Sequence, residues 1–153
     1  MQKRLLATIF WLVGLLCATA CGTSRPGIAA SGDPLLPQKE QVWQLVALRG
    51  KPVGKEMVTI TFNTEAGIVS GTAPCNRYGA DCRFSSRTES PEGDRYSIAI
   101  ANVTHTDILC PDADMNAEAR YLALLSKADA VLVGAYTITM YQHDKETLRF
   151  ELQ

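Results

Sequence analysis

The sequence predicts a mainly β fold, namely a small antiparallel β-barrel or half-barrel of seven to eight strands packed on a single α-helix. Apolar and polar residues alternate with period two in most segments after Gln41, which is the pattern of half-buried antiparallel strands. One segment, residues 112–127, instead has its apolar residues at helical spacing. A sheet of many short strands hides its edges by curling on itself, and a helix can cover an open side.

The predicted strands follow one another closely along the chain. The strand from Trp43 to Ala47 has three apolar residues on one face, and the strand from Val58 to Phe62 alternates three apolar residues with two threonines. Residues 63–67 contain Asn and Gly, which tolerate the backbone of a tight hairpin turn. Further strands are predicted at residues 68–71, 81–86, 96–101, 130–133, 136–141 and 147–152, with turns at 92–94 and 143–146.

The predicted helix lies between Asp112 and Lys127. Asp112 or Asp114 is expected to cap the first amides, and both carboxylates favour the positive end of the helix dipole, while Lys127 favours the negative end. The apolar residues expected to face the sheet are Met115, Ala119, Leu122 and Leu125. We interpret this stripe as part of the core and not as a surface for a partner.

The composition excludes two classes of protein. Of the 153 residues, 46% are hydrophobic and 20% charged, which suffices for one globular core and excludes intrinsic disorder. Fifteen Lys and Arg residues against sixteen Asp and Glu residues give a formal net charge of −1. Since no basic cluster could neutralise a run of phosphates, we expect no nucleic acid partner.

The first 20 residues predict an export signal. Two basic residues precede the apolar stretch Leu5–Leu16, which is followed by small residues. The segment Ala18-Thr19-Ala20-Cys21 resembles a bacterial lipobox, in which signal peptidase cuts before a cysteine that carries a diacylglycerol. The resemblance implies that residues 1–20 are removed and that Cys21 is lipidated. Because Gly22 and not Asp follows the cysteine, the resemblance also implies transport to the outer membrane.

An uncleaved anchor helix is the alternative interpretation of this region. Residues 5–24 carry no charge, and about 20 apolar residues suffice to span a bilayer. The last third of the stretch is small and polar, which favours the lipoprotein. In both interpretations the domain lies outside the cytoplasm. We expect an outer membrane lipoprotein that faces the periplasm, held to the membrane through acyl chains on Cys21.

A tether and one domain are expected after the signal. Residues 21–39 are rich in Pro, Gly and Ser and lack hydrophobic periodicity, as flexible spacers do. A flexible chain of this length spans roughly 25 Å, enough to lift a small domain clear of the headgroups. The domain itself is expected at residues 40–153.

Three segments resemble one known family. The run Gly71-Thr72-Ala73-Pro74-Cys75-Asn76-Arg77-Tyr78-Gly79 is similar to the signature of the META domain (HslJ-like) family, in which Cys-Asn-Arg-aromatic lies between two glycines. The family's Trp-x-Leu is matched by Trp43 and Leu45, and its Thr-x-x-x-Cys by Thr106 and Cys110. The resemblance implies a small antiparallel barrel or half-barrel packed on a helix, often in envelope lipoproteins linked to stress, antibiotic tolerance and virulence. It implies no established enzymatic activity.

Three cysteines remain for the folded domain, and an odd number cannot pair completely within one chain. The resemblance implies a disulfide between Cys75 and Cys110, with a bond between Cys82 and Cys110 as the alternative. Such a cross-link would contribute about 3 kcal/mol by restricting the unfolded chain. A redox role is disfavoured because the spacing of Cys75 and Cys82 is not the Cys-x-x-Cys arrangement that lowers a thiol pKa.

Asn76, Arg77 and Tyr78 form a possible recognition loop. A structural role competes with this hypothesis, because an Asn beside a cystine most often bonds to local backbone. The two histidines, His105 and His143, belong to no ligand motif, so we expect no metal and no cofactor.

The function expected from these features is non-enzymatic. We expect a cell-envelope lipoprotein whose domain binds an envelope component and supports stress tolerance or surface integrity. The alternative is a periplasmic carrier of a small apolar ligand, because an eight-stranded barrel can just enclose one small molecule. The expected partners are therefore the membrane, through Cys21, and an envelope protein or small ligand.

Overall fold

The computed structural model describes residues 36–54 and 57–153, and within these ranges it contains nine strands and one helix. In chain order they are β1 (Trp43–Leu48), β2 (Lys51–Pro52), β3 (Thr59–Asn63), β4 (Ile68–Thr72), β5 (Arg77–Ser90), β6 (Gly93–His105), α1 (Asp112–Leu125), β7 (Ala130–Val133), β8 (Thr137–Gln142) and β9 (Lys145–Leu152). The expected signal peptide, Cys21 and most of the expected tether lie outside the described residues.

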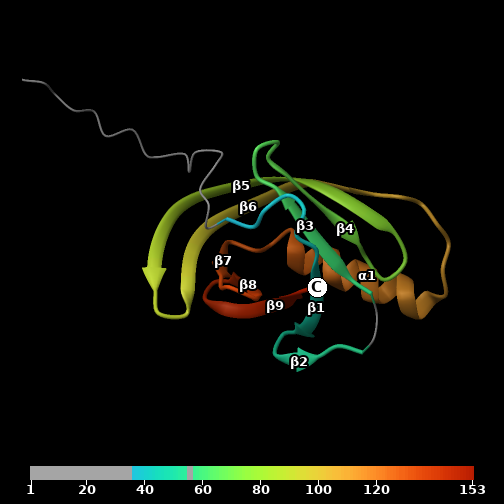
Figure 1. Cartoon of the computed structure of the whole chain (residues 1–153). Helices are drawn as coiled ribbons and strands as arrows, with labels where there is room; N and C mark the ends of the chain where they lie inside the picture. Colours follow the sequence, from blue (N-terminus) through green and yellow to red (C-terminus); the bar gives the residue numbers. More distant parts are fainter. Residues whose placement is uncertain (1–35, 55–56) are drawn as a thin grey trace, which may run out of the picture.

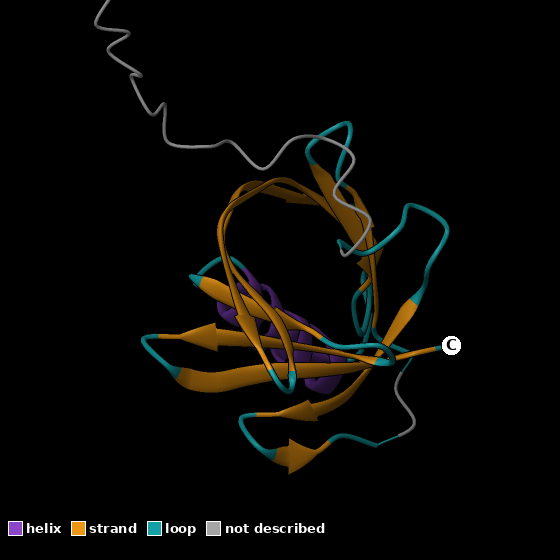
Figure 2. Ribbon diagram, turned by 60° about the vertical axis from the view of Figure 1, so that its left-hand side comes forward, coloured by secondary structure: helices purple, strands orange, loops and turns teal. Residues whose placement is uncertain are grey.

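Eight of these strands form a closed antiparallel barrel (Figure 1). Neighbours pair in the order β1-β3-β4-β5-β6-β7-β8-β9, and β9 pairs again with β1 to close the ring. The short β2 lies outside the ring and pairs with the end of β1. Figure 2 shows α1 across the opening of the ring. The predicted mainly β fold with a single helix is therefore confirmed.

The hairpin of β5 and β6 is much longer than predicted. Its register shifts twice, between Gly79 and Asp81 and between Ser85 and Arg87. Ser86 and Asn102, which lie at these shifts, have positive φ angles of 31° and 51°. Such bulges increase the local bend and twist of a strand pair, and here they curve the hairpin around the barrel (Figure 1). The predicted strand ended at residue 86 and missed residues 87–90, because residues 85–90 are all exposed and do not alternate.

Side chains fill the interior of the barrel. The ring of Phe84 meets those of Phe62 and Tyr96 edge to face, with centroids 5.6 and 6.0 Å apart, an orientation that aromatic pairs favour. The largest side chains exposed by less than 2% are Trp43, Tyr96, Tyr121, Phe62, Phe150, Ile60, Leu125, Ile138, Met140 and Leu148. A ligand in the centre of the barrel would have to displace this packing.

The face of α1 that meets the barrel differs from the predicted stripe. Glu118, Tyr121, Leu124 and Leu125 are buried, whereas Met115 is 42% exposed. Of the predicted stripe, Ala119 is also exposed and Leu122 is half-buried, so Leu125 alone of the four is fully buried. The prediction failed because two polar side chains, Glu118 and Tyr121, occupy the contact face, and a search for apolar periodicity passes over them.

The helix ends were predicted only in part. Acidic residues do occupy the first turn, but the N-cap is Pro111 and no side chain bonds the free amides there, so capping by Asp112 or Asp114 is wrong. The helix ends at Leu125, which places Lys127 beyond the last turn. Asp112 and Asp114 thus act on the helix through its dipole and not through a capping bond.

The folded domain begins earlier than residue 40. Leu36 is 4% exposed and belongs to the core, and Pro37 is buried as well. The composition of the preceding stretch hid this boundary, because Pro and Gly on either side of Leu36 give the appearance of a continuous spacer.

Candidate functional site

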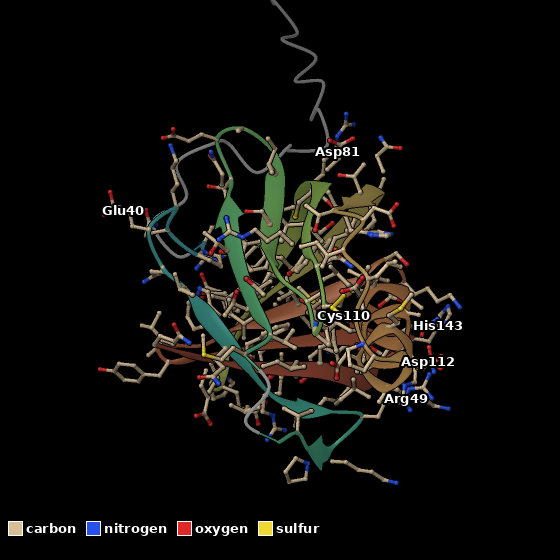
Figure 3. All side chains as sticks on the ribbon, turned by 90° about the vertical axis from the view of Figure 1, so that its right-hand side faces the viewer. Glu40, Arg49, Asp81, Cys110, Asp112 and His143 are labelled. Atoms are coloured by element: carbon tan, nitrogen blue, oxygen red, sulfur yellow. A yellow bond between two sulfur atoms is a disulfide. The ribbon has the colours of Figure 1, made fainter. Side chains whose placement is uncertain are left out.

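The residues of the family signature gather where α1 meets the barrel. A disulfide joins Cys75, just before β5, to Cys110, just before α1, with the two Cα atoms 5.9 Å apart. The segment from Thr106 to Pro111, which we call the strap, connects β6 to α1. The N-terminal end of α1 and the strap face the viewer in Figure 3, where Cys110 is labelled.

Cys82 is the free cysteine of the described residues, so the alternative bond between Cys82 and Cys110 is not formed. Cys82 lies on the inward face of β5 and is 4% exposed. Burial raises the pKa of its thiol to about 12, so the thiol remains protonated at neutral pH. A protonated, buried thiol is a poor nucleophile, which makes Cys82 a core residue.

Asn76 ties the strap to the barrel. Its side chain is buried, and its Oδ1 accepts hydrogen bonds from Thr106 Oγ1 at 2.7 Å and from the backbone amide of Ile108 at 2.8 Å. Its Nδ2 donates to Glu118 Oε1 at 2.9 Å. Asn76 therefore bonds both the strap and the helix. These partners are 30 to 42 residues away in the sequence, so the bonds are tertiary contacts and not bonds to local backbone.

Glu118 of α1 is a buried carboxylate, 6% exposed, that receives backbone donors from the signature. The amide of Asn76 donates to its Oε2 at 2.6 Å and the amide of Cys75 at 3.1 Å. Burial raises the pKa of Glu118, but the donors from Asn76 and Cys75, with His105 nearby, outweigh burial and lower the pKa below its ordinary value. The carboxylate is thus ionised at neutral pH and fixes the loop before β5 to the helix.

Tyr78 and Tyr121 form a second buried link between β5 and α1. Their hydroxyl oxygens are 2.7 Å apart, and Tyr78 donates to the carbonyl oxygen of Thr59 at 3.0 Å. Because a hydroxyl has a single proton, Tyr121 must be the donor to Tyr78. Burial raises the pKa of both tyrosines, so both hydroxyls stay protonated at physiological pH.

The expected recognition loop is therefore not one exposed surface. Asn76 and Tyr78 are buried and bonded inward, and Arg77 alone of the three is exposed. The reason is strand alternation, since Arg77 and Tyr78 begin β5 and their side chains point to opposite faces. The signature residues position other parts of the domain.

The strap, which Asn76 holds in place, carries an exposed pair of apolar residues. Ile108 is 57% exposed and Leu109 is 85% exposed, and Met115 in the first turn of α1 is 42% exposed. Ile108 and Leu109 were not among the predicted site residues. The available signal was an apolar pair inside a segment too short and too close to Pro111 to form a strand.

A groove lies at the end of the barrel away from α1. β5 starts beside Glu118 and ends at Ser90, which lines this groove. The groove has a volume of about 560 Å³, and its lining includes Leu36, Pro37, Gln41, Trp43, Glu92 and Val133. The indole Nε1 of Trp43 is buried without a hydrogen-bond acceptor in the part of the chain that the structure describes. We call this region the end groove.

Among the described residues we find neither a cluster of side chains suited to a metal ion nor a helix suited to crossing a membrane. His105 and His143 lie apart, and residues 36–54 and 57–153 contain no group of three or more His, Cys, Asp or Glu side chains that could hold a metal ion. Within the same ranges, no helix has the length and apolarity that a membrane crossing requires.

The comparisons with known proteins agree with this architecture. Two solved structures share the fold, both determined by NMR. The first is 23% identical over 74% of this chain and 90% of its own, with a TM-score of 0.51. The second, from Burkholderia xenovorans, is 21% identical over 82% of this chain and 93% of its own, with a TM-score of 0.53. No match was found among curated proteins.

Both likenesses lie below 25% identity and therefore show the fold alone. The family comparison goes further, because the META domain model matches residues 36–153, which is most of the chain and includes the disulfide, the strap and the buried links to α1. The match starts at Leu36, which is itself a residue of the hydrophobic core. This protein belongs to the META domain family.

Proposed function

We propose that this protein is a non-enzymatic lipoprotein of the cell envelope, which binds another envelope component through its META domain and supports stress tolerance or surface integrity. The observation that carries the proposal is how the buried polar groups are used. The side chains of Asn76 and Glu118 bond to each other and to backbone, and those of Tyr78 and Tyr121 bond to each other and to the carbonyl oxygen of Thr59. Asn76 also bonds the strap, whose apolar side chains are exposed. This arrangement suits binding.

The same contacts argue against chemistry at this site. Both oxygens of Glu118 accept hydrogen bonds, and the thiol of Cys82 is buried and protonated. A catalytic base or nucleophile must reach a substrate atom at hydrogen-bonding distance. Side chains that are enclosed and already bonded do not offer that access.

The resemblance of residues 18–21 to a lipobox supports the envelope location, and lipidation at Cys21 can be tested directly. Cells would be fed an alkyne-bearing fatty acid, and the purified protein would be coupled to a fluorescent azide. The lipobox-like segment predicts a labelled protein in the membrane fraction, and Cys21→Ser should lose the label. Cys17→Ser is the matched control and should keep it. An unlabelled protein would contradict the lipid anchor.

The role in stress can be tested in the same strains. A strain in which the gene for this protein is deleted should grow less well under envelope stress, and expression of the wild-type protein should restore growth. If the anchored protein acts at the envelope, Cys21→Ser should restore growth less well than Cys17→Ser. Equal growth of the deletion and the wild type under several envelope stresses would contradict this part of the proposal.

A second candidate function is the binding of a small, mainly apolar ligand in the end groove. The centre of the barrel is filled, but the groove combines apolar walls at Leu36 and Val133 with Trp43, whose buried indole N–H lacks an acceptor among the described residues. An unpaired buried donor costs about 1–3 kcal/mol, and a ligand oxygen in reach would relieve that cost. A volume of about 560 Å³ lies within the range of small-molecule sites.

The indole N–H resonance of Trp43 provides the test. Trp11 is removed with the signal peptide in the proposed mature protein, so Trp43 is its one tryptophan and the NMR signal can be assigned without doubt. Titration with 1-octanol, which has an apolar body and one oxygen, should shift this signal in a saturable way, and octane should have a weaker effect. A signal that does not move with 1-octanol would contradict this candidate.

A further inference from the structure

The strap presents apolar side chains on a backbone that is fixed from beneath. The amide of Ile108 donates to Asn76 Oδ1, and the amide of Thr106 donates to the carbonyl oxygen of Arg77 at 3.0 Å. The disulfide of Cys110 fixes the other end of the strap. Despite these restraints, the side chains of Ile108 and Leu109 remain 57% and 85% exposed.

This combination lowers the cost of binding. Ordering a loop and its side chains at an interface opposes association, and a surface that is rigid beforehand avoids much of that cost. Folding has already ordered the strap through Asn76 and the disulfide. An aliphatic or aromatic anchor that enters a partner's pocket forms the centre of a binding interface, and Ile108 and Leu109 are exposed aliphatic side chains on a restrained backbone.

The charges around the strap favour one kind of partner. Asp107 and Asp112 are exposed and Asp114 is half-buried, and none of the three forms an ion pair with a described residue. Arg77, whose backbone bonds to Thr106, contributes one positive charge nearby. Three carboxylates against one guanidinium leave the surroundings of the apolar pair acidic at neutral pH.

We propose that Ile108, Leu109 and Met115 form a docking surface for a protein that presents an apolar pocket bordered by Lys and Arg. This inference rests on the proposed binding function and specifies its surface and the chemistry of its partner. Basic residues around the pocket would meet Asp107 and Asp112, and such complementarity steers association and fixes orientation. A lipid surface fits less well, because anionic headgroups repel the same carboxylates.

Site-specific photocrosslinking in intact host cells tests the surface. A photoreactive benzoylphenylalanine would replace Leu109 in the full chain, and the matched control would carry it at Tyr136, which is 75% exposed in the turn before β8. We expect a discrete protein adduct at position 109 and not at position 136. Peptide mapping of the adduct should place Lys or Arg beside the crosslinked site of the partner.

A charge reversal tests the chemistry of the partner. Asp107→Lys should lower the yield of the adduct at position 109 at least about fivefold, because it replaces attraction by repulsion. Glu65→Lys, in the exposed turn between β3 and β4, is the matched control and should leave the yield unchanged. Thermal unfolding of all variants should match the wild type, since every changed side chain is exposed.

Four outcomes would overturn the inference. They are no adduct at position 109, the same adducts at positions 109 and 136, an adduct that contains phospholipid alone, and an adduct between two copies of this chain. If Asp107→Lys leaves the adduct yield unchanged, the inference that Lys and Arg border the partner's pocket would be wrong. The fatty acid label at Cys21 is measured separately, so loss of the anchor and loss of the docking surface would be distinguished.

Discussion

The two ends of the barrel differ in how completely their buried polar groups are bonded. At the end that meets α1, Glu118 accepts three hydrogen bonds from Cys75 and Asn76, and the two tyrosine hydroxyls form a chain to Thr59. In the end groove, the indole N–H of Trp43 has no acceptor within the described ranges. The buried polar groups at the helix end are therefore bonded to protein partners, whereas the end groove is lined by a tryptophan whose buried donor has no partner among the described residues.

The largest effect should come from Glu118. Replacement by Ala removes the Glu118 acceptor of three buried or partly buried N–H groups of Cys75 and Asn76, and the free energy of unfolding should fall by about 4 kcal/mol. Urea denaturation followed by circular dichroism measures the loss. Glu92→Ala, an exposed carboxylate at the end groove, should change stability by less than about 0.5 kcal/mol. Equal losses of unfolding free energy in Glu118→Ala and Glu92→Ala would show that the two ends of the barrel do not differ in this way.

The disulfide should have the next largest effect. Cys75→Ser combined with Cys110→Ser removes a link between residues 35 positions apart and should cost about 3 kcal/mol, mainly because the unfolded chain gains freedom. Urea unfolding with and without a reductant provides the measurement, and reductant should leave the double variant unchanged. If reductant has no effect on the wild type, the cross-link contributes nothing to stability.

A smaller effect is expected for the tyrosine pair. Tyr78→Phe removes the acceptor of Tyr121 and the donor to Thr59, which should cost about 1.5 kcal/mol. The control is Tyr136→Phe, where a side chain that is 75% exposed loses only contact with water. Thermal unfolding of both variants would show whether the buried hydroxyl chain stabilises the helix end.

The smallest effect should appear as a dependence on pH. Since the pKa of Glu118 is lower in the folded protein than its ordinary value, the native state binds this proton more weakly than the unfolded chain. The stabilisation is complete above the ordinary glutamate pKa of about 4.3 and is lost as the pH falls through the native pKa. The stability difference between wild type and Glu118→Gln should therefore narrow from pH 7 toward about pH 3. A difference that stays constant over this range would contradict the role of the ionised carboxylate.

The strands were predictable because their pattern is local. Val58, Ile60 and Phe62 alternate with threonines and all three are buried as expected. The strand at residues 130–133 was predicted with its observed bounds. β2 escaped prediction because two exposed residues, Lys51 and Pro52, carry no alternation. Residues 87–90 of β5 escaped it for the same reason, since all four are exposed.

The candidate site was predictable in its residues and not in their roles. The sequence singled out Asn76, Arg77 and Tyr78 as a recognition loop, and it left two alternatives for the disulfide, Cys75–Cys110 and Cys82–Cys110. It could not show that Asn76 points toward Glu118, because these residues are 42 positions apart and no local pattern links them. Nor could it show that the strap between Thr106 and Pro111 leaves Ile108 and Leu109 exposed, since apolar residues are ordinarily assigned to the core.

The sequence by itself determined the class of fold, the one helix of the described residues and the family, because alternation, helical spacing and the Cys-Asn-Arg-Tyr run are patterns of neighbouring residues. The tertiary structure decided which face of α1 is buried, which thiol stays free and which residues form a surface. Those outcomes depend on contacts between segments that are distant in the sequence. A buried carboxylate such as Glu118 is stable only when it is hydrogen-bonded, and its donors belong to Asn76 and Cys75, 42 and 43 residues away.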